Sequence, residues 1–324
     1  MRVFAAAEIE TLINPRSLVE ALRLAFQEAR VCPPRQFVAL PGGAQQRLCL
    51  IMSAFDSRGA GAVKVVTVFP GNAAGSLPTI QGAILLFSEE GTPVAMLDGT
   101  IVTRLRTAAA SALASTFLSR QDSAHLVIIG TGSLAPYMAA AHAAVRPIRR
   151  ISVCGRREAA AQRTAAAIRL MVNPEVEVVS SCSVEVVVAD ADIVTCATSS
   201  ATPVLAGRWL REGVFVDLVG GFSPDKREAD DDVMKRSRIF VDTREGAMAE
   251  AGDILDPLSR GVIGSGQVEA ELADLVSGRN AGRTKHDEVV TFKSVGTAIE
   301  DFAAAQAILA AVCREEGANG ELPP

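Results

Sequence analysis

A chain of 324 residues, of which 49% are hydrophobic and 21% are charged, is long enough for two domains with complete cores and has the composition of a globular protein. Its formal net charge of -5, with the basic residues scattered along the chain, argues against nucleic acid as a partner. The six cysteines form no CxxC pair and the chain has only three histidines, so we expect buried free thiols, a reducing compartment and no metal site.

The first residues, MRVFAAAEIE, lack the basic start and long apolar core of a secretory signal peptide. Further along the chain, charged residues interrupt the apolar runs before they reach the length needed to cross a membrane. We therefore expect a cytoplasmic protein with no membrane partner.

The first third of the chain predicts one helix followed by several strands. Asn14 and Pro15 suit the N-cap and first turn of a helix that extends to about Ala29, because apolar residues then recur at helical spacing. Short apolar runs bounded by Gly, Pro, Asn and Asp predict strands, and Gly91 suits the turn of a hairpin between the last two. The expected strands cover residues 47–55, 61–69, 82–88 and 93–98.

A helix rich in Ala and Ser is expected over residues 103–119, and its small side chains suit close packing at a domain or subunit contact. Arg104 and Arg106 precede or open this helix, although the helix dipole disfavours cations at an N-terminus. A bound carboxylate, shared by Arg106 and the free N–H groups of the first turn, would resolve the conflict.

Two more basic residues of the first third are candidates for the same anion. Lys64 lies in the middle of an expected strand and faces the same side as Val66 and Val68. It therefore either reaches past the edge of the sheet or is placed for a ligand. Arg35, in the sequence PPRQF, is by composition alone closer to a surface turn than to a ligand contact.

From Ser123 onward, strands and helices alternate, which is typical of a parallel sheet covered on both faces and so of the α/β class. A last helix is expected over residues 297–316, followed by a polar tail, 317–324, that we expect to be frayed. The strand-like runs cover residues 125–130, 151–155, 176–179, 192–198, 214–220, 239–242 and 289–293.

The run HLVIIGTGSLAPYMAAAHAA predicts a dinucleotide-binding turn. Gly130, Gly132 and Ala135 have the G-x-G-x-x-A spacing, between a strand and a helix with Pro136 in its first turn. Glycine allows a tight turn and lets backbone N–H groups approach a pyrophosphate, whose charge a helix N-terminus favours. The alternative is a tight turn without a ligand. The residues expected around the pyrophosphate are Gly130, Thr131, Gly132, Ser133, Leu134 and Ala135.

The next strand should end beside the adenosine ribose. Where NAD enzymes carry an acidic residue for the ribose 2′-hydroxyl, this chain has Gly155, Arg156 and Arg157, which suit a 2′-phosphate. We therefore expect NADP(H) to be preferred, with NAD(H) possible, unless the two arginines form only a solvated turn. At the strand ends where a Rossmann sheet meets the nicotinamide, the expected contacts are Thr198, Val219, Gly220, Lys293 and Ser294.

Five stretches, taken in order, resemble the ornithine cyclodeaminase and mu-crystallin family over nearly the whole chain. They are VKVVTVFPGN, GTPVAMLDGTIVTRLRTAAASALA, VIIGTGSLA, DLVGGFSPDKREADDD and VVTFKSVGTAIEDFAAAQ. The resemblance implies a homodimer with an interrupted architecture. Residues 1–118, completed by 297–324, would form an α+β substrate-binding and dimerisation domain around an inserted Rossmann NAD(P)-binding domain at 119–296.

The resemblance also implies that Arg35, Lys64 and Arg106 hold the carboxylate of an amino acid or a cyclic imino acid. Members of the family cyclise ornithine to proline, oxidise alanine or reduce cyclic ketimine acids at one nicotinamide, and mu-crystallin also serves as an NADPH-dependent hormone-binding protein. Lys64 and Arg106 would then be the catalytic residues, and Lys64 could donate a proton to the imine nitrogen.

Phe222 departs from the cyclodeaminases, which have GGD-PGK-E where this chain has GGFSPDKRE. A phenyl ring neither takes a proton nor pairs with an ammonium, so Phe222 suits a substrate-binding site for a compact apolar ring. The loop resembles that of the pyrroline-2-carboxylate reductases of the family. The expected reaction is NADPH-dependent reduction of Δ1-pyrroline-2-carboxylate or Δ1-piperideine-2-carboxylate to L-proline or L-pipecolate. The alternatives are an ornithine cyclodeaminase or amino-acid dehydrogenase using NAD+, and a non-catalytic NADPH-dependent binding protein.

Other polar residues receive no catalytic role. Asp225 and the acidic run at 230–232 are expected to be solvated surface carboxylates. The reaction requires no metal and no nucleophile, and the chain offers no convincing Ser-His-Asp or Cys-His pattern. His125, His142 and His286 are therefore expected to be structural or exposed.

Overall fold

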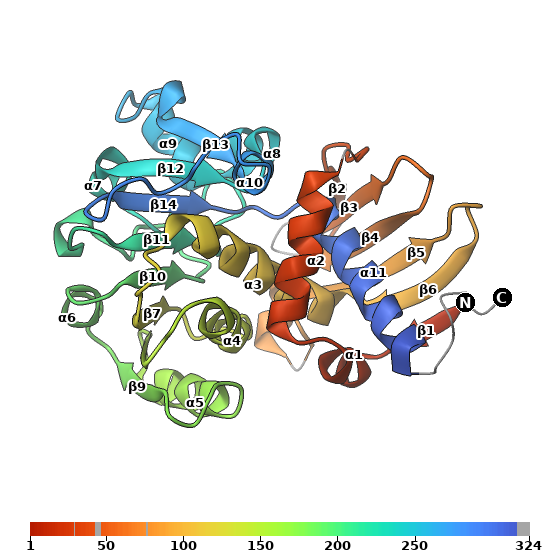
Figure 1. The fold of residues 1–324 in the computed structure, drawn as a ribbon, viewed down its shortest axis with the longest axis horizontal. Coiled ribbons are helices and arrows are strands. Elements are labelled where there is room, and N and C mark those ends of the chain that lie inside the picture. Colours follow the sequence, from red (N-terminus) through yellow and green to blue (C-terminus); the bar gives the residue numbers. More distant parts are fainter. Residues whose placement is uncertain (29, 43–46, 76, 316–324) are drawn as a thin grey trace. The chain divides into compact units, whose positions relative to one another are not determined.

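The computed structural model describes residues 1–28, 30–42, 47–75 and 77–315, and it divides the chain into two compact units. Unit 1 comprises Met1–Arg106 and the C-terminal residues from Thr297, and unit 2 comprises Thr107–Gly296 (Figure 1). The first boundary lies inside a long helix, whereas the sequence placed it at residue 118, where that helix ends. The expected frayed tail and Ala29 lie outside the described residues.

Unit 1 contains a six-stranded sheet in the order β1-β6-β5-β4-β3-β2, with all neighbours antiparallel except β1 and β6. The β5–β6 hairpin turns at Gly91, whose φ of 76° favours glycine, as the sequence predicts. The strands are β1 (Arg2–Phe4), β2 (Gln36–Leu40), β3 (Arg47–Phe55), β4 (Gly61–Val68), β5 (Ile80–Phe87) and β6 (Pro93–Asp98). The helices are α1 (Ala6–Leu12), α2 (Pro15–Gln27), a 3-10 turn (Pro70–Ala74), the start of α3 (Gly99–Leu118) and α11 (Ala298–Glu315).

The two faces of this sheet differ in burial. Helix α11 packs against β3, β4 and β5 and beside α2 (Figure 1), and the residues beneath it, such as Met52, Lys64 and Ile84, are buried. The next residue along each strand points its side chain to the opposite face of the sheet. Of these, Val3 and Val65 are exposed, so the second face of the sheet presents apolar side chains to solvent.

Helix starts in unit 1 follow from side-chain caps. The Asn14 carboxamide accepts a hydrogen bond from the Ser17 N–H at 2.9 Å, which confirms the predicted start of α2. Helix α3, however, begins four residues before the expected position, because the Asp98 carboxylate accepts from the N–H groups of Thr100 and Ile101 at 2.8 and 3.0 Å.

Unit 2 contains an eight-stranded sheet in the order β13-β12-β14-β11-β10-β7-β8-β9, and every pairing is parallel (Figure 1). All residues of β7, β10, β11 and β14 are buried regardless of the direction in which they point, so both faces of the sheet are covered. These features confirm the predicted α/β class with a Rossmann-type sheet. The strands are β7 (His125–Ile129), β8 (Arg150–Cys154), β9 (Glu177–Ser181), β10 (Ile193–Cys196), β11 (Phe215–Leu218), β12 (Ser237–Val241), β13 (Val268–Glu271) and β14 (Val289–Lys293).

Helices and short 3-10 turns connect these parallel strands. Helix α4 begins at Ala135 with Pro136 in its first turn, as predicted. The helices are α4 (Ala135–Val145), α5 (Glu158–Arg169), α6 (Val184–Val188), α7 (Asp231–Arg236), α8 (Arg244–Glu250), α9 (Gly252–Ser259) and α10 (Leu272–Val276), with 3-10 turns at Gly207–Trp209 and Ser265–Gln267.

All six cysteines are free, but the prediction that they are buried is correct only for Cys154 and Cys196. Cys182 is exposed because it directly follows β9, which is an edge strand of the unit 2 sheet. In the part of the chain that the structure describes, no helix is both long enough and apolar enough to span a membrane.

Candidate active site

Unit 1 contains a buried cluster of charges in which Lys64 and Arg106 meet two acids of α11. The Lys64 Nζ lies 2.6 Å from Asp301 Oδ2, and the Arg106 Nε donates to Asp301 Oδ1 at 3.1 Å. A second Arg106 nitrogen donates to Glu300 Oε2 at 2.6 Å. None of the four side chains is more than 7% exposed, so the cations are held inside the unit rather than at its surface.

Burial and charge act in opposite directions in this cluster. Burial lowers the pKa of Lys64 to about 8; Asp301 opposes that shift, while Arg106 and Arg35 add to it. Burial alone would raise the pKa of Asp301, but Lys64, Arg106 and Arg35 outweigh it and the pKa is lowered. Arg35, immediately before β2, is therefore close enough to act on both groups, and three cations that the sequence singled out surround one carboxylate.

The expected position of Arg106 at the start of the helix needs correction. Because α3 begins at Gly99, Arg106 lies in the second turn, and Asp98 already accepts from N–H groups of the first turn. The charge of Arg106 is balanced by Glu300 and Asp301, which sequence reasoning did not single out. Their signal was two adjacent acids near the start of an otherwise alanine-rich apolar helix.

The glycine turn of unit 2 joins β7 to α4. Gly130 has a φ of 131°, and a Cβ there would lie inside van der Waals contact of the Ala197 carbonyl. A Cβ on Gly132 would meet no atom within 4 Å, so this part of the turn is open. Within the described residues, no N–H group of Thr131, Gly132 or Ser133 donates a hydrogen bond. Open N–H donors at a helix N-terminus fit a pyrophosphate.

The segment after β8 contains two exposed arginines and one acid, Glu158, that is bound to other residues. Arg156 and Arg157 are exposed, and neither guanidinium group forms an ion pair or hydrogen bond with another residue that the structure describes. The neighbouring Glu158 carboxylate instead accepts from Ser180 Oγ at 2.8 Å and from Cys182 Sγ at 3.1 Å. This segment therefore fits a phosphate group better than a ribose hydroxyl.

The expected nicotinamide residues lie at the carboxyl ends of β10, β11 and β14. The Glu228 carboxylate accepts from both the N–H and the hydroxyl of Thr198, and from the Gly220 N–H. Burial raises the pKa of Glu228 to about 7, although Lys293 acts in the opposite direction. Val219, which precedes Gly220, is buried.

Lys293 and Ser294 point into unit 2. The Lys293 Nζ lies 3.1 Å from Asp253 Oδ2, and both side chains are fully buried. Ser294 donates to Asp242 Oδ2 at 3.0 Å, and the same oxygen accepts from the N–H groups of Val295 and Gly296. These acids order the segment after β14, and neither was identified from the sequence.

The segment from Phe222 to Asp232 is less uniform than the sequence indicates. Phe222 is half-buried and packs against the hydrophobic core of unit 2. Asp225 is exposed, as expected. The expectation of a solvated acidic face is wrong for two residues, because Asp230 caps α7 by accepting from the Val233 N–H and Asp231 pairs with Arg227.

The histidines have the structural or exposed positions that the sequence predicts. His142 is fully buried, with its Nε2 3.3 Å from Asp217 Oδ2 and 3.2 Å from Thr195 Oγ1. His125 Nε2 lies 2.9 Å from Ser152 Oγ, and His286 is exposed.

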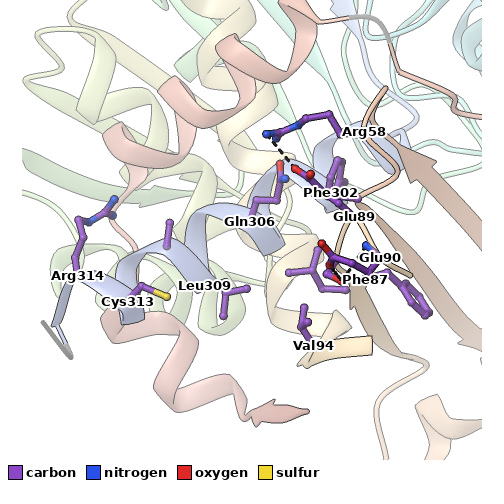
Figure 2. Close-up of a pocket in the computed structure, with 14 residues that line it drawn as sticks. Arg58, Phe87, Glu89, Glu90, Val94, Phe302, Gln306, Leu309, Cys313 and Arg314 are labelled. Atoms are coloured by element: carbon purple, nitrogen blue, oxygen red, sulfur yellow. Dashed lines mark hydrogen bonds and ion pairs between the residues drawn. The ribbon is translucent and has the colours of Figure 1, made fainter. Parts of the chain in front are cut away.

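A cavity of about 600 Å³ lies in unit 1 between α11 and the β5–β6 hairpin. Figure 2 shows apolar side chains such as Phe87 and Leu309 lining it, with Arg58 paired to Glu89 at 3.0 Å. None of the residues that the sequence singled out lines this cavity. It is therefore separate from the Lys64 and Arg106 cluster.

Known proteins resemble the chain over most of its length. The Δ1-pyrroline-2-carboxylate reductase of Paracoccus denitrificans is 39% identical over 290 residues, which cover 89% of each protein. The structure of Thermococcus litoralis Δ1-pyrroline-2-carboxylate reductase in complex with NADH and L-proline superposes with a TM-score of 0.92 at 33% identity, covering 98% of this chain and 99% of that one. An archaeal alanine dehydrogenase dimer with bound NAD has a TM-score of 0.89 at 28% identity, covering 98% and 97%.

The family model described as the ornithine cyclodeaminase/mu-crystallin family matches residues 2–316. This match, together with relatives named as pyrroline-2-carboxylate reductases, confirms the resemblance found in the sequence. The chain belongs to the ornithine cyclodeaminase/mu-crystallin family.

Proposed function

We propose that the protein is an NAD(P)H-dependent oxidoreductase acting on C=N bonds. Its substrate would be a cyclic ketimine acid, Δ1-pyrroline-2-carboxylate or Δ1-piperideine-2-carboxylate, and its product L-proline or L-pipecolate. The observation that carries the proposal is the buried cluster of Lys64 and Arg106 with Arg35 nearby. The relatives named as Δ1-pyrroline-2-carboxylate reductases support the choice of substrate.

The cluster is suited to a substrate that carries a carboxylate. Arg35, Lys64 and Arg106 bring three cationic side chains together beside Glu300 and Asp301. A substrate carboxylate could accept charge-assisted hydrogen bonds from these cations. The arginine side chains would hold the carboxylate in a fixed orientation, which lowers the entropic part of the barrier.

Lys64 is suited to act as the proton donor. When bound, the reduced nicotinamide supplies the hydride that adds to C2 of the imine. The imine nitrogen then needs a proton, and the Lys64 ammonium, with its pKa lowered to about 8, donates more readily than an ordinary lysine. The neutral amine that remains beside Asp301 can be reprotonated from water, because the carboxylate stabilises its charged form.

Residues of unit 2 would hold the dinucleotide. The N–H groups of the turn at Gly130–Ala135 would bind the pyrophosphate, and the segment at Gly155, Arg156 and Arg157 would bind the adenosine end. We propose that NADP(H) is preferred over NAD(H), because the two arginines are available for a 2′-phosphate while the Glu158 carboxylate is engaged by Ser180 and Cys182.

At the nicotinamide end, Thr198, Val219, Gly220, Lys293 and Ser294 would shape the site. Because the Lys293 side chain is buried against Asp253 and the Ser294 hydroxyl faces Asp242, these two residues would act through their backbone. Phe222 would limit the substrate pocket on the apolar side and exclude the second amine that a cyclodeaminase needs.

The open face of the unit 1 sheet would mediate homodimerisation. Val65 is 41% exposed, and the residues opposite it on neighbouring strands, Ile51 and Ala83, lie on the same face. An apolar sheet face of this kind is typical of a subunit contact, and an archaeal relative of similar structure is described as a dimer. Substitution Val65→Asp should shift the protein toward monomers in sedimentation velocity, whereas Leu24→Asp, at an exposed apolar position on α2, should not.

The decisive experiment mixes the purified protein with NADPH or NADH and each cyclic imine and follows the nicotinamide absorbance. Oxidation of NADPH with formation of L-proline or L-pipecolate is expected. Production of proline and ammonia from ornithine with NAD+, with no reaction of either imine, would replace the proposal by cyclodeamination. Tight NADPH binding without turnover of any of these substrates would identify a binding protein.

A further inference from the structure

Glu228 is a fully buried acid that joins two loops of unit 2. Its Oε1 accepts from the Thr198 N–H at 2.6 Å and the Thr198 hydroxyl at 2.8 Å. Its Oε2 accepts from the N–H groups of Gly220 and Gly221 at 2.7 and 3.3 Å. One carboxylate therefore connects the segment after β10 to the segment after β11.

Glycine at position 220 allows these segments to approach closely. A Cβ on Gly220 would overlap the backbone of Thr198 and approach Glu228 Oε1 to 2.6 Å. The two loops are therefore packed backbone against backbone, with no side chain between them. The Glu228 carboxylate bonds to both loops and so helps to set their spacing.

A buried ion pair, Asp253 with Lys293, holds the backbone of Glu228 in place. Asp253 Oδ1 accepts from the N–H groups of Glu228 and Ala229 at 2.7 and 3.0 Å. Asp253 Oδ2 lies 3.1 Å from the Lys293 Nζ at the end of β14. Consequently the carboxyl ends of three strands, β10, β11 and β14, are connected through two acids and one lysine, all fully buried.

This connection lies where ligands bind to parallel sheets, outside the carboxyl ends of the strands. We infer that Glu228 is a positioning residue that fixes the loops of Thr198 and Gly220 against the nicotinamide half of the cofactor without contacting the reacting atoms. The inference rests on the proposed dinucleotide site. It distinguishes the nicotinamide end from the adenosine end, whose glycine turn and arginines belong to β7, β8 and their loops.

The substitution Glu228→Gln tests this role. It keeps the size of the side chain but turns an acceptor oxygen into an NH2 group that faces N–H donors, so one of the two loops loses its bond. We expect the affinity for NADPH to fall about 10- to 100-fold, as for the loss of hydrogen bonds to a charged group. The affinity for 2′,5′-ADP, which is the adenosine half alone, should change less than about twofold because it does not reach these loops.

A matched control is Glu288→Gln, in a glutamate that accepts from Thr284 and Arg238 before the start of β14, at the opposite end of the sheet. This variant should leave the affinities for both NADPH and 2′,5′-ADP unchanged. Thr198→Val removes a single donor to Glu228 and keeps the backbone bond, so it should lower NADPH affinity alone by a smaller factor even if Glu228→Gln folds poorly.

The decisive quantity is the ratio of NADPH affinity to 2′,5′-ADP affinity, measured by calorimetry. A ratio that falls in Glu228→Gln and Thr198→Val supports the inference. Equal loss of both affinities, or no loss in either folded variant, overturns it by showing a purely structural role. The measurement needs no imine, so failure of the proposed reaction does not affect it, and the same ratio for NADH and ADP applies if the 2′-phosphate is not preferred.

Discussion

Replacement of Asp301 by Asn should lower the pKa of Lys64, the proposed proton donor, so far that its amine is mostly neutral at pH 7. The Lys64 pKa is about 8 with Asp301 at 2.6 Å, and burial is the larger influence. Breaking a buried ion pair costs about 3–5 kcal/mol, and each pKa unit corresponds to about 1.4 kcal/mol. If that energy is lost by the ammonium form, the Lys64 pKa falls by about 2 to 4 units, to about 6 or below.

The consequence is a specific change in the pH profile. A general acid must be protonated, so activity is present below its pKa and is lost above it. At pH 7, Lys64 is about nine-tenths protonated with a pKa of 8, but about one-tenth or less with a pKa of 6. The Asp301→Asn variant should therefore lose about tenfold or more of kcat at pH 7 and regain activity as the pH is lowered toward 5.5.

The assay measures kcat with NADPH and the cyclic imine from pH 5 to 9 for wild type and variant. The ratio of the two curves removes the titration of the imine, which is common to both. Glu300→Gln is the matched control, because Glu300 bonds to Arg106 at 2.6 Å; it should raise KM but leave the alkaline limb in place. An alkaline limb at the same pH in Asp301→Asn and wild type would refute Lys64 as the donor.

Four further substitutions test other parts of the structure. Arg156→Ala and Arg157→Ala should each raise KM for NADPH by about 10- to 100-fold, with little change in KM for NADH. Arg163→Ala replaces an exposed arginine of α5 and should leave both KM values unchanged. Equal effects on the two cofactors would contradict the preference for NADPH. Phe222→Asp should lower kcat/KM for the imine by about tenfold or more, because a carboxylate disfavours an apolar ring; unchanged imine reduction would remove Phe222 from the substrate site. Asp242→Ala should lower the free energy of unfolding by about 2–4 kcal/mol in thermal or urea denaturation, because three buried donors lose their acceptor; an unchanged midpoint would count against that role.

The regular elements of unit 2 were largely predictable from the sequence. Strands of an all-parallel sheet are buried on both faces and so appear as continuous apolar runs, as in β7 and β14. Strands that were missed are short or lie at an edge of their sheet. β1 has three residues and β13 has four, and β2 is exposed along most of its length. Apolar periodicity cannot identify such strands, because β1 and β13 are too short to show a repeat and β2 buries little of its surface.

The start of α3 shows a second limit. Asp98 ends an apolar strand and was interpreted as the boundary of that strand, yet its carboxylate also caps the helix that follows directly. A residue that serves both elements leaves no loop between them, and propensity alone cannot divide such a segment. The consequence was an incorrect environment for Arg106, since the same arginine at a helix N-terminus or one turn further on meets different partners.

The buried acids mark the limit that matters most for the chemistry. Lys64 and Arg106 could be singled out from the sequence because a cation in an apolar strand or beside a small-residue helix conflicts with its local surroundings. The partner that relieves this conflict, Asp301, is separated from Arg106 by 195 positions. In an alanine-rich helix, an acid facing solvent and an acid facing a buried cation have the same local sequence pattern. A single sequence can therefore identify a cation that needs a counterion but not the counterion itself, and here Asp301 is among the groups that set the pKa of Lys64.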